Sequence, residues 1–334
     1  MDHGIRGARI LCAVDSYVVD QIRARRPRSA RALHNIELID ALTALGAEVE
    51  LFGVDERNAD ICAVLGSAKR DLVFNLALSG TVREFHFIAL LELLSLRYTG
   101  SDPATIMLCR NKFACLQVLA ATGISVPKRA LITSPRTIPA CLRMPVILKP
   151  SVGTGSRGIG RKSIIYRLAS LHGQIKSTLR KFDLPVVAEE FVAGREFRVS
   201  AVESKRHQFE VVSISESVFP KCYRGFGIMT GALKRHWMVQ HVKKGIKVRP
   251  ARLTASLTEQ IYKTSLRSLQ ILGVEGYAAL DIRMNDAGEL FVIDVNPNPN
   301  LRKVGISWSR PSFEENVKRI VLAGLRRQSH LPRN

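Results

Sequence analysis

Long apolar runs are missing from this sequence of 334 residues, of which 46% are hydrophobic and 24% are charged. Apolar stretches such as Ile88–Leu91 and Val146–Leu148 are far shorter than the roughly 20 residues that a membrane-spanning helix needs. The run Ile10–Val14 is also too short for the core of a signal peptide, and Asp15 closes it. The composition is that of a globular protein, and we expect neither a membrane span nor a secretory leader.

Cysteine pairs with metal-binding or redox spacing are also missing. No Cys-x-x-Cys pair and no His/Cys spacing that suits zinc occurs among the six cysteines, which are Cys12, Cys62, Cys109, Cys115, Cys141 and Cys222. In a chain without a secretory signal we expect free thiols, and therefore a cytoplasmic location.

Acidic residues are scarce, because 29 Asp and Glu stand against 50 Lys and Arg, which gives a net charge of +21. A charge of this sign attracts nucleic acids, membrane surfaces and phosphorylated small molecules. Basic residues cluster at 23–31 and 234–252, but no aromatic residues interleave the first cluster and no nucleic-acid-binding motif is present. We expect mostly solvated surface charge, with an acidic small-molecule ligand as the first alternative. We do not expect a nucleic-acid partner, and binding through residues 23–31 would require a steep dependence on salt.

The first part of the chain, residues 1–100, alternates between strand and helix patterns. Ser29–Leu45 carries apolar residues at three-residue steps and is followed by Gly46, where a helix C-cap favours glycine. We expect a second helix at 87–94, strands at 9–14, 48–52 and 71–75, and a turn at 100–103. This order predicts an open parallel sheet and an α/β fold class.

Two further units are expected, at residues 101–187 and 188–334, in line with the two or three domains that this length favours. The first has predicted helices at 111–122 and 166–182 and strands at 129–132 and 146–149. The second is α+β, with predicted strands at 186–191, 197–202, 210–213, 278–284 and 290–295 and helices at 254–272 and 314–325. A long irregular basic segment, 216–252, is expected to be functional or mobile.

A lysine followed by a glycine-rich loop is the first pattern that indicates chemistry. Lys149 ends an apolar strand, so its ammonium emerges where open α/β sheets bind ligands. In the following loop, 151–158, three glycines let backbone N–H groups approach phosphate oxygens, and Thr154 and Ser156 add hydroxyl donors. The spacing of a P-loop is absent, and a plain surface turn is the alternative.

Three carboxylates around a tight turn form the second pattern, in the segment Glu189-Glu190-Phe191-Val192-Ala193-Gly194-Arg195-Glu196. Backbone groups at such a strand end can pair with the edge of an adenine, and Glu196 can hold ribose hydroxyls. An acidic hairpin without a ligand is an equally good interpretation.

The strongest pattern is a pair of strands joined by the turn Asn285–Gly288. Asp294 and Asn296 are two residues apart on an extended strand, so their side chains share a face, and Asp281 on the paired strand can meet them there. Two carboxylates and an amide oxygen suit Mg²⁺, which also takes phosphate oxygens. A structural hairpin is the alternative, although two aspartates buried together without a cation would be costly.

In this order, the patterns resemble the ATP-grasp superfamily, and more closely its D-alanine–D-alanine ligase branch. The resemblance extends over most of the chain, and it also includes Asp71–Asn75, Leu91–Asp102, Asn111-Lys112 and Ala121–Pro127. It implies an ATP-grasp fold with an N-terminal Rossmann-like domain. It also implies a carboxylate–amine ligase that uses ATP and forms an amide through an acyl phosphate.

The resemblance assigns roles to individual residues. Lys112 and Lys149 match lysines that contact ATP phosphates, and Glu189, Glu190, Phe191 and Val192 match the adenine-binding strand end. Glu196 matches the ribose-binding carboxylate. Ser156 matches a serine that orients substrate, and Lys234 matches a lysine that reaches the γ-phosphate from a mobile loop. Asp281, Asp294 and Asn296 match the ligands of two Mg²⁺ ions, which Mn²⁺ can replace.

The chain also departs from the family pattern. Family ligases carry an oxyanion-stabilising arginine where this chain has Ala279, and a glycine where it has Asn300. We consider Arg283, two residues after the first metal aspartate, as a replacement for the arginine. Asp294 stands where the branch usually has glutamate, and the glycine-rich acceptor segment is replaced by 78–84.

These departures favour a ligase whose substrates are small amino-acid-like or peptide-like carboxylates and amines other than D-alanine. The alternatives are a true D-alanine–D-alanine ligase, or a nucleotide-binding regulatory protein that has lost most of its activity. The sequence leaves a homodimer open and does not identify the substrates.

Overall fold

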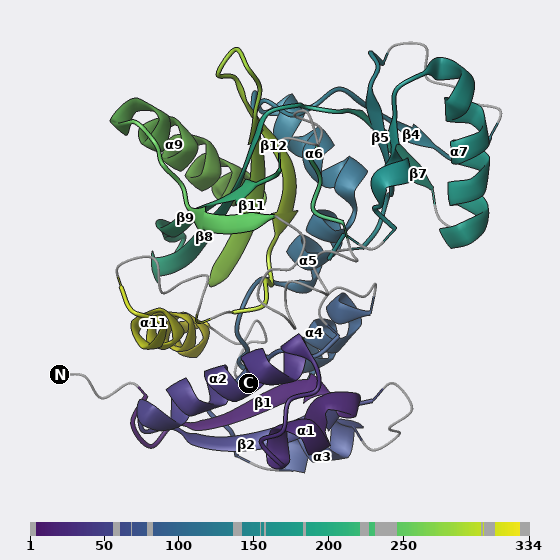
Figure 1. Cartoon of the computed structure of the whole chain (residues 1–334). Coiled ribbons are helices and arrows are strands. Elements are labelled where there is room, and N and C mark those ends of the chain that lie inside the picture. Colours follow the sequence, from purple (N-terminus) through teal and green to yellow (C-terminus); the bar gives the residue numbers. More distant parts are fainter. Residues whose placement is uncertain are drawn as a thin grey trace.

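The structure is a computed structural model that describes residues 5–55, 61–67, 69–78, 83–135, 142–153, 155–156, 158–182, 185–220, 227–230, 246–301, 303 and 311–327. Its described residues build three separate sheets (Figure 1).

The N-terminal sheet is parallel, with strand order β2-β1-β3, as the alternation of patterns predicts. Its strands are β1 (Arg9–Asp15), β2 (Glu48–Val54) and β3 (Leu72–Asn75). The predicted helices are α2 (Ala30–Ala44), whose first turn is capped by the Ser29 side chain, and α4 (Glu84–Leu93). Three short helical segments were not predicted from the sequence: η1 (Ser16–Val18), α1 (Val19–Arg23) and α3 (Ile61–Ser67).

Two helices link this unit to the rest of the chain, α5 (Pro103–Arg110) and α6 (Lys112–Ala121). The segment at Pro103 was expected to be a turn, but it begins α5. The Asp102 side chain accepts a hydrogen bond from Thr105 N at 2.6 Å, and Pro103 occupies the first turn, where its missing N–H costs nothing.

The middle sheet is antiparallel, with strand order β4-β7-β5-β6. Its strands are β4 (Arg129–Ile132), β5 (Val146–Pro150), β6 (Ile164–Ile165) and β7 (Val186–Glu190); the short helix η2 (Arg161–Ser163) precedes β6, and α7 (Leu168–Phe182) covers one face. The predicted unit boundary at 187/188 falls inside β7, which pairs with β4 and β5. The strand as a whole therefore belongs with the middle sheet.

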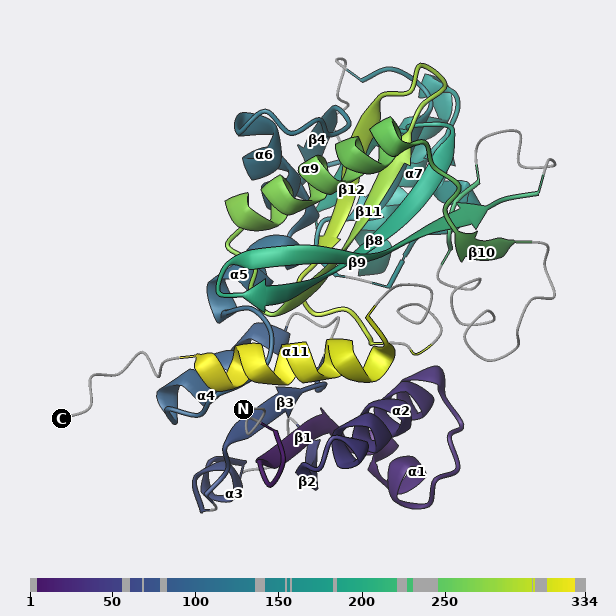
Figure 2. The ribbon, with the colours of Figure 1, turned by 90° about the vertical axis from the view of Figure 1, so that its left-hand side faces the viewer.

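The C-terminal sheet has strand order β10-β9-β8-β11-β12 and is antiparallel throughout. It consists of β8 (Arg195–Lys205), β9 (Gln208–Val218), β10 (Lys247–Pro250), β11 (Tyr277–Met284) and β12 (Leu290–Asn296), with α9 (Ala255–Ile271) packed against it. The helix α11 (Phe313–Arg326) lies between this sheet and α2 (Figure 2). One apolar cluster, which includes Leu42, Phe74, Val202 and Val317, therefore joins the first and last units.

The segment 216–252 is less irregular than expected where the structure describes it. The strand β9 runs on to Val218, and Lys247–Pro250 returns as β10 to pair with it. Residues 221–226 and 231–245 lie outside the described part of the chain, and so does Lys234.

One glycine sets the close approach of the turn between β7 and β8 to β11. Gly194 has a φ of +123°, and a Cβ built on it would lie 2.1 Å from the carbonyl oxygen of Met284.

We expect Gly194→Ala to lower the free energy of unfolding by about 3 kcal/mol, because the cost of the backbone strain and the cost of the clash with Met284 add. Chemical denaturation measures this. Gly288→Ala is the control, since Gly288 also has a positive φ but open space around it, and should cost only about 1 kcal/mol. If the two variants lost the same free energy of unfolding, the contact with Met284 would contribute nothing to the effect of Gly194→Ala.

Candidate active site

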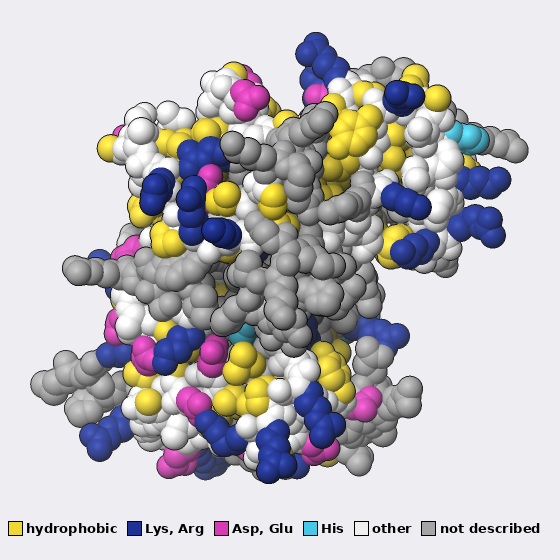
Figure 3. All heavy atoms as spheres, viewed as in Figure 1, with side chains coloured by type: hydrophobic (Ala, Val, Ile, Leu, Met, Phe, Trp, Pro, Cys, Tyr) yellow, Lys and Arg dark blue, Asp and Glu magenta, His cyan; other side chains and the backbone are white. Residues whose placement is uncertain are grey.

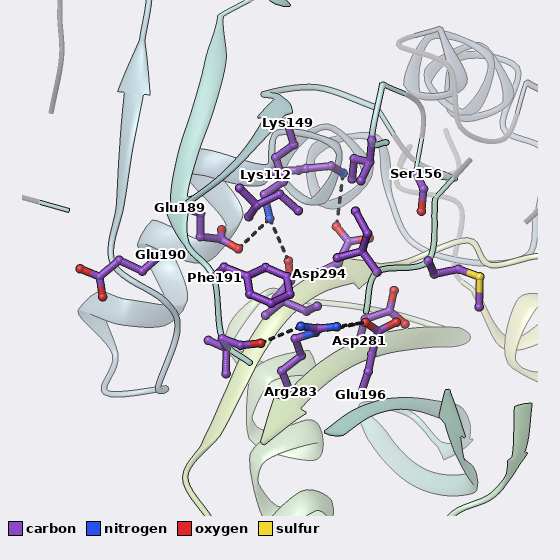
Figure 4. Close-up of a pocket in the computed structure, with 16 residues that line it drawn as sticks. Lys112, Lys149, Ser156, Glu189, Glu190, Phe191, Glu196, Asp281, Arg283 and Asp294 are labelled. Atoms are coloured by element: carbon purple, nitrogen blue, oxygen red, sulfur yellow. Dashed lines mark hydrogen bonds and ion pairs between the residues drawn. The ribbon is translucent and has the colours of Figure 1, made fainter. Parts of the chain in front are cut away.

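A pocket of about 710 Å³, part of it open to solvent, lies between the middle and C-terminal sheets (Figure 4). Every described residue predicted for the site lines the pocket except Asn296. The lining consists of Lys112, Ile147, Lys149, Ser156, Ile159, Glu189, Glu190, Phe191, Val192, Glu196, Ile228, Met229, Asp281, Arg283, Ile293 and Asp294.

Lys149 is buried in the pocket wall and paired with a carboxylate. Its Nζ lies 2.9 Å from Glu189 Oε1 and 3.5 Å from the carbonyl oxygen of Ile293. The side chains of Lys149 and Glu189 are 7% and 3% exposed. The second carboxylate oxygen of Glu189 is buried and has no hydrogen-bond donor among the described residues. It can therefore accept a hydrogen bond from a bound molecule, such as the amino group of an adenine.

Lys112 reaches the pocket from the first turn of α6. Asn111 caps this helix by accepting a hydrogen bond from Ala114 N, and Lys112 N donates to the carbonyl oxygen of Ser151. These bonds tie the helix start to the glycine-rich loop. The Lys112 Nζ contacts the carbonyl oxygen of Gly153 and lies 3.3 Å from Asp294 Oδ1.

Two aspartates face each other across neighbouring strands. Asp281 on β11 is the direct partner of Asp294 on β12, next to a register shift, and both line the pocket. Each carboxylate contacts a cation, because Arg198 on β8 lies 3.0 Å from Asp281 Oδ1 and Lys112 contacts Asp294. Proteins commonly bind Mg²⁺ through one or two carboxylates, and substrate phosphates supply further ligands. The two neighbouring aspartates could therefore be the protein ligands of Mg²⁺, and the two lysines in the same pocket could contact the phosphates.

Asn296, the third predicted metal ligand, is engaged elsewhere. Its Oδ1 accepts hydrogen bonds from Arg110 Nη1 at 3.0 Å and from Asn298 N at 3.1 Å. The structure therefore brings together the two aspartates of the predicted set but not the asparagine. Among the described residues, no group of three or more His, Cys, Asp or Glu side chains could hold a metal ion by itself.

Arg110 belongs to a buried polar network that the sequence did not predict. Its Nε donates to Glu84 Oε2 at 2.8 Å, and Asn298 Nδ2 donates to Glu84 Oε1 at 2.7 Å. The hydroxyl of Tyr277 donates to Asn298 Oδ1, and burial raises the pKa of this tyrosine well above its usual value. The tyrosine therefore remains a neutral donor, and the network fixes Asn296 and Asn298 against the N-terminal unit.

Arg283 lines the pocket and lies four residues after Ala279 on β11. Its Nη2 donates to Glu196 Oε2 at 2.8 Å, its Nη1 donates to the carbonyl oxygen of Val192 at 2.6 Å, and its guanidinium stacks on the Phe191 ring at 4.5 Å. Figure 4 shows this guanidinium between Phe191 and Glu196. Along an extended strand, four residues span about 13 Å. The backbone of Arg283 is therefore about 13 Å along β11 from that of Ala279, and its guanidinium is held by Glu196 and Val192.

The remaining predicted residues divide between the pocket and its rim. Ser156 lines the pocket, with a φ of +57°. Glu190 points away from the other labelled residues in Figure 4, and its Oε1 accepts a hydrogen bond from Arg143 N at 2.9 Å. Neighbouring residues of a strand point to opposite faces, which explains why Glu189 faces the lysine and Glu190 does not.

Arg198 is a site residue that the sequence analysis missed. Glu196 and Arg198 are two residues apart on β8, and their direct partners on β11 are Arg283 and Asp281. Both cross-strand pairs carry opposite charges, an arrangement that stabilises antiparallel strands. The alternation of charge along 196–198 and 281–283 is the signal that would have revealed the pairing.

The pocket lining combines apolar and charged side chains. It includes the apolar residues Ile147, Ile228 and Ile293 together with two lysines and two aspartates, Lys112, Lys149, Asp281 and Asp294. A ligand with a flat apolar group and a polyanionic tail fits such a lining. Among the described cysteines, Cys12, Cys62, Cys109 and Cys115 are free, as expected; Cys141 and Cys222 lie outside the described residues. No helix in the described part is long and apolar enough to cross a membrane.

Known proteins share both sequence and fold with this chain. A D-alanine–D-alanine ligase of Geotalea uraniireducens (strain Rf4) is 28% identical over 306 residues, which are 89% of this chain and 89% of that protein. The uncharacterized protein y4sG of Sinorhizobium fredii is 26% identical over 232 residues, which are 69% of this chain and 66% of that protein.

Solved structures have the same fold. A D-alanine–D-alanine ligase from Bacillus anthracis complexed with ATP has a TM-score of 0.73 at 20% identity, covering 96% of this chain and 98% of that chain. The VanG D-Ala:D-Ser ligase from Enterococcus faecalis has a TM-score of 0.74 at 17% identity, covering 96% of this chain and all of that chain.

A family model described as “D-ala D-ala ligase C-terminus” matches residues 124–308, which are more than half of the chain. The matched range includes Lys149, Asp281 and Asp294. The chain therefore belongs to the D-alanine–D-alanine ligase family of ATP-grasp proteins, and it is an ATP-dependent C–N ligase.

Proposed function

We propose that the chain joins a carboxylate to an amine through an acyl phosphate, and that its substrates are amino-acid-like or peptide-like molecules other than D-alanine. The observation that carries this proposal is the convergence of Lys112, Lys149, Asp281 and Asp294 on one pocket, next to an altered position at Ala279. The nucleotide end is complete in these residues, whereas the residue expected to stabilise the intermediate is missing.

The reaction follows from the arrangement of charges. Lys112 and Lys149 would hold phosphate oxygens of ATP, and Asp281 and Asp294 would hold Mg²⁺, which would supply neutralisation of the phosphate charge. An oxygen of the substrate carboxylate attacks the γ-phosphorus, the bond to the β-phosphate oxygen breaks, and ADP leaves. The amine then attacks the acyl carbon, a proton is lost from nitrogen, and phosphate leaves. The protein contributes mainly positioning and charge, with Ser156 and, by resemblance, Lys234 on the substrate and γ-phosphate side.

The altered acceptor region supports a substrate pair other than D-alanine with D-alanine. Losing one oxyanion donor typically costs about 10²–10³ in rate. Arg283 is held by Glu196 and Val192, so no other arginine of β11 compensates for Ala279. Asn300 also places a side chain where the family pattern has glycine. Both changes alter the part of the site that would contact the second substrate.

A substrate screen tests the proposal. Purified protein with Mg²⁺ and ATP is offered paired panels of amino acids, short peptides and other carboxylates and amines, and ADP release is measured. We expect release that requires both a carboxylate and an amine, with a product of matching mass, and little release with D-alanine alone. Turnover with D-alanine that exceeds every other pair would contradict the proposed specificity. Tight ATP binding without turnover on any pair would contradict the proposed ligase reaction.

Lys149 should contribute to both ATP affinity and stability. We expect Lys149→Met to raise the Kd for ATP at least tenfold and to lower the free energy of unfolding by about 3 kcal/mol, because Glu189 is left buried without its partner. Calorimetry and chemical denaturation measure the two effects.

A double variant separates these two effects. Adding Glu189→Gln to Lys149→Met removes the buried unpaired charge, so stability should largely return while ATP affinity stays low. If ATP affinity returned together with stability, Lys149 would be a structural residue only.

Arg283 should position Glu196 for the ribose. We expect Arg283→Met to raise the Kd for ATP about tenfold, because the carboxylate loses two charged hydrogen bonds. The Kd for 2′-deoxy-ATP should change much less, so that discrimination between the two nucleotides shrinks. The matched control is Arg195→Met, which removes a cross-strand partner of Glu216 outside the pocket and should leave both Kd values unchanged. Equal weakening of both nucleotides by Arg283→Met would count against the positioning role.

A further inference from the structure

The excess positive charge is concentrated in one stretch of the chain. From Pro103 to Phe182 the sequence has no Asp or Glu in 80 residues, but it has 14 Lys and Arg. This stretch therefore accounts for +14 of the net charge of +21. Lys112 and Lys149 serve the pocket and Arg110 the buried network, but most of the others have no part in either.

Much of this charge lies on the outer side of the middle sheet. Six exposed basic side chains lie on α7 and on the segment that leads into it: Lys162, Arg167, His172, Lys176, Arg180 and Lys181. We call this set the α7 basic face. At the right-hand edge of Figure 3, over α7, Lys and Arg side chains gather beside a His and no Asp or Glu is seen.

The α7 basic face is not neutralised within the part of the chain that the structure describes. None of its six residues forms an ion pair there, and Lys181 instead lies 5.3 Å from the centroid of the Phe182 ring. Exposed arginines of the N-terminal unit behave differently, since Arg25 pairs with Asp40 at 2.6 Å and Arg9 lies 3.7 Å from Asp71. Unbalanced charge of one sign along a helix attracts an anionic partner.

The middle of α7 is open to close approach. Gly173 lies inside an exposed stretch of the helix, and nothing in the described structure lies within 4 Å of the position that its Cβ would take. A glycine there costs about 1 kcal/mol relative to alanine, and no packing contact explains it. Ala169 and Ser177, four residues to either side, are also small and exposed. Beside them, His172, Lys176 and Arg180 follow one another at four-residue steps, which is about 6 Å along the helix.

We infer that the α7 basic face binds the phosphate backbone of a nucleic acid. Lysine, arginine and serine side chains are the usual partners of backbone phosphates, and a row of small residues lets the backbone approach the helix. An anionic membrane fits less well, because membrane-bound helices place large apolar side chains beside their lysines. Here the apolar residues Leu171 and Ile175 are buried against the sheet, and the large exposed apolar side chains, Tyr166 and Leu168, lie only at the start of the helix.

This surface and the nucleotide pocket are on opposite faces of the middle sheet. Leu148 packs in the apolar cluster with Leu171 of α7, whereas its neighbours Ile147 and Lys149 line the pocket. A nucleic acid on α7 therefore leaves the pocket open. From the sequence we did not expect a nucleic-acid partner, because the basic clusters visible there were 23–31 and 234–252. The sequence does not show that the basic residues of 162–181 share a surface.

Fluorescence anisotropy with labelled 24-nucleotide strands tests the inference, using single-stranded RNA, single-stranded DNA and duplex DNA of one sequence. The full chain should bind at 50 mM salt. The triple variant Lys176→Ala, Arg180→Ala, Lys181→Ala should bind at least tenfold more weakly, and its slope of log affinity against log salt should be smaller by about 2 on a single strand. The order of affinity among the three strands identifies the kind of nucleic acid.

A second variant, Gly173→Gln, tests the close approach to the helix. It should weaken binding severalfold, because the longer side chain fills the space beside the backbone. It should raise the thermal midpoint of unfolding, because glutamine is a better helix former than glycine.

The matched control removes three exposed arginines elsewhere, in the triple variant Arg23→Ala, Arg26→Ala, Arg28→Ala. It should bind almost as well as the unchanged protein, and all variants should keep the same ATP affinity, which shows that they are folded. Equal loss of binding in the two triple variants would mean that net charge alone is responsible and would overturn the assignment to α7. The absence of binding to all three strands would overturn it, and so would stronger binding to phosphatidylglycerol vesicles than to any strand.

Discussion

Two like charges held next to each other are the constraint on which the site depends. Asp281 and Asp294 are direct partners on neighbouring strands, and each contacts a cation of the protein, Arg198 or Lys112. Two carboxylates that face each other across neighbouring strands repel each other unless a cation lies nearby. The sheet therefore presents a pair of acceptors whose charges are balanced by side chains from two other elements, β8 and α6. A magnesium ion with a triphosphate would take over part of that balancing role, and Lys112 would then be available for phosphate.

The same sheet connects this pair to the rest of the molecule. On one side, Arg283 and Glu196 continue the row of charges toward the nucleotide end of the pocket. On the other side, Asn296 and Asn298 are fixed by Arg110 and Glu84, which come from α5 and α4. The position expected to stabilise an intermediate, Ala279, is the direct cross-strand partner of Asn296. Under the function that we propose, the chain keeps the nucleotide machinery of its family and changes the surroundings of the acceptor, which is why we separate its reaction class from its substrate.

The sequence revealed those features that local rules decide. Strand alternation located β11 and β12, and the turn at Asn285–Gly288 fixed their register closely enough to place Asp281 opposite Asp294. Pairings between distant segments were not visible: Arg198 meets Asp281 across 83 residues, and Arg110 meets Asn296 across 186. Asn296 was predicted as a ligand because it shares a strand face with Asp294, yet a buried guanidinium competes for its oxygen. The segment that ends at Pro103 was interpreted as a turn, although an aspartate followed by a proline is also typical of a helix start.

The most direct measurement of the central claim is anomalous diffraction from crystals grown with Mn²⁺ and a non-hydrolysable ATP analogue. Our account predicts a manganese peak between the carboxylates of Asp281 and Asp294, at about 2 Å from an oxygen of each. The triphosphate should lie against Lys112 and Lys149. A manganese peak bound to Asn296 but to neither aspartate, or a triphosphate bound away from the two lysines, would contradict it.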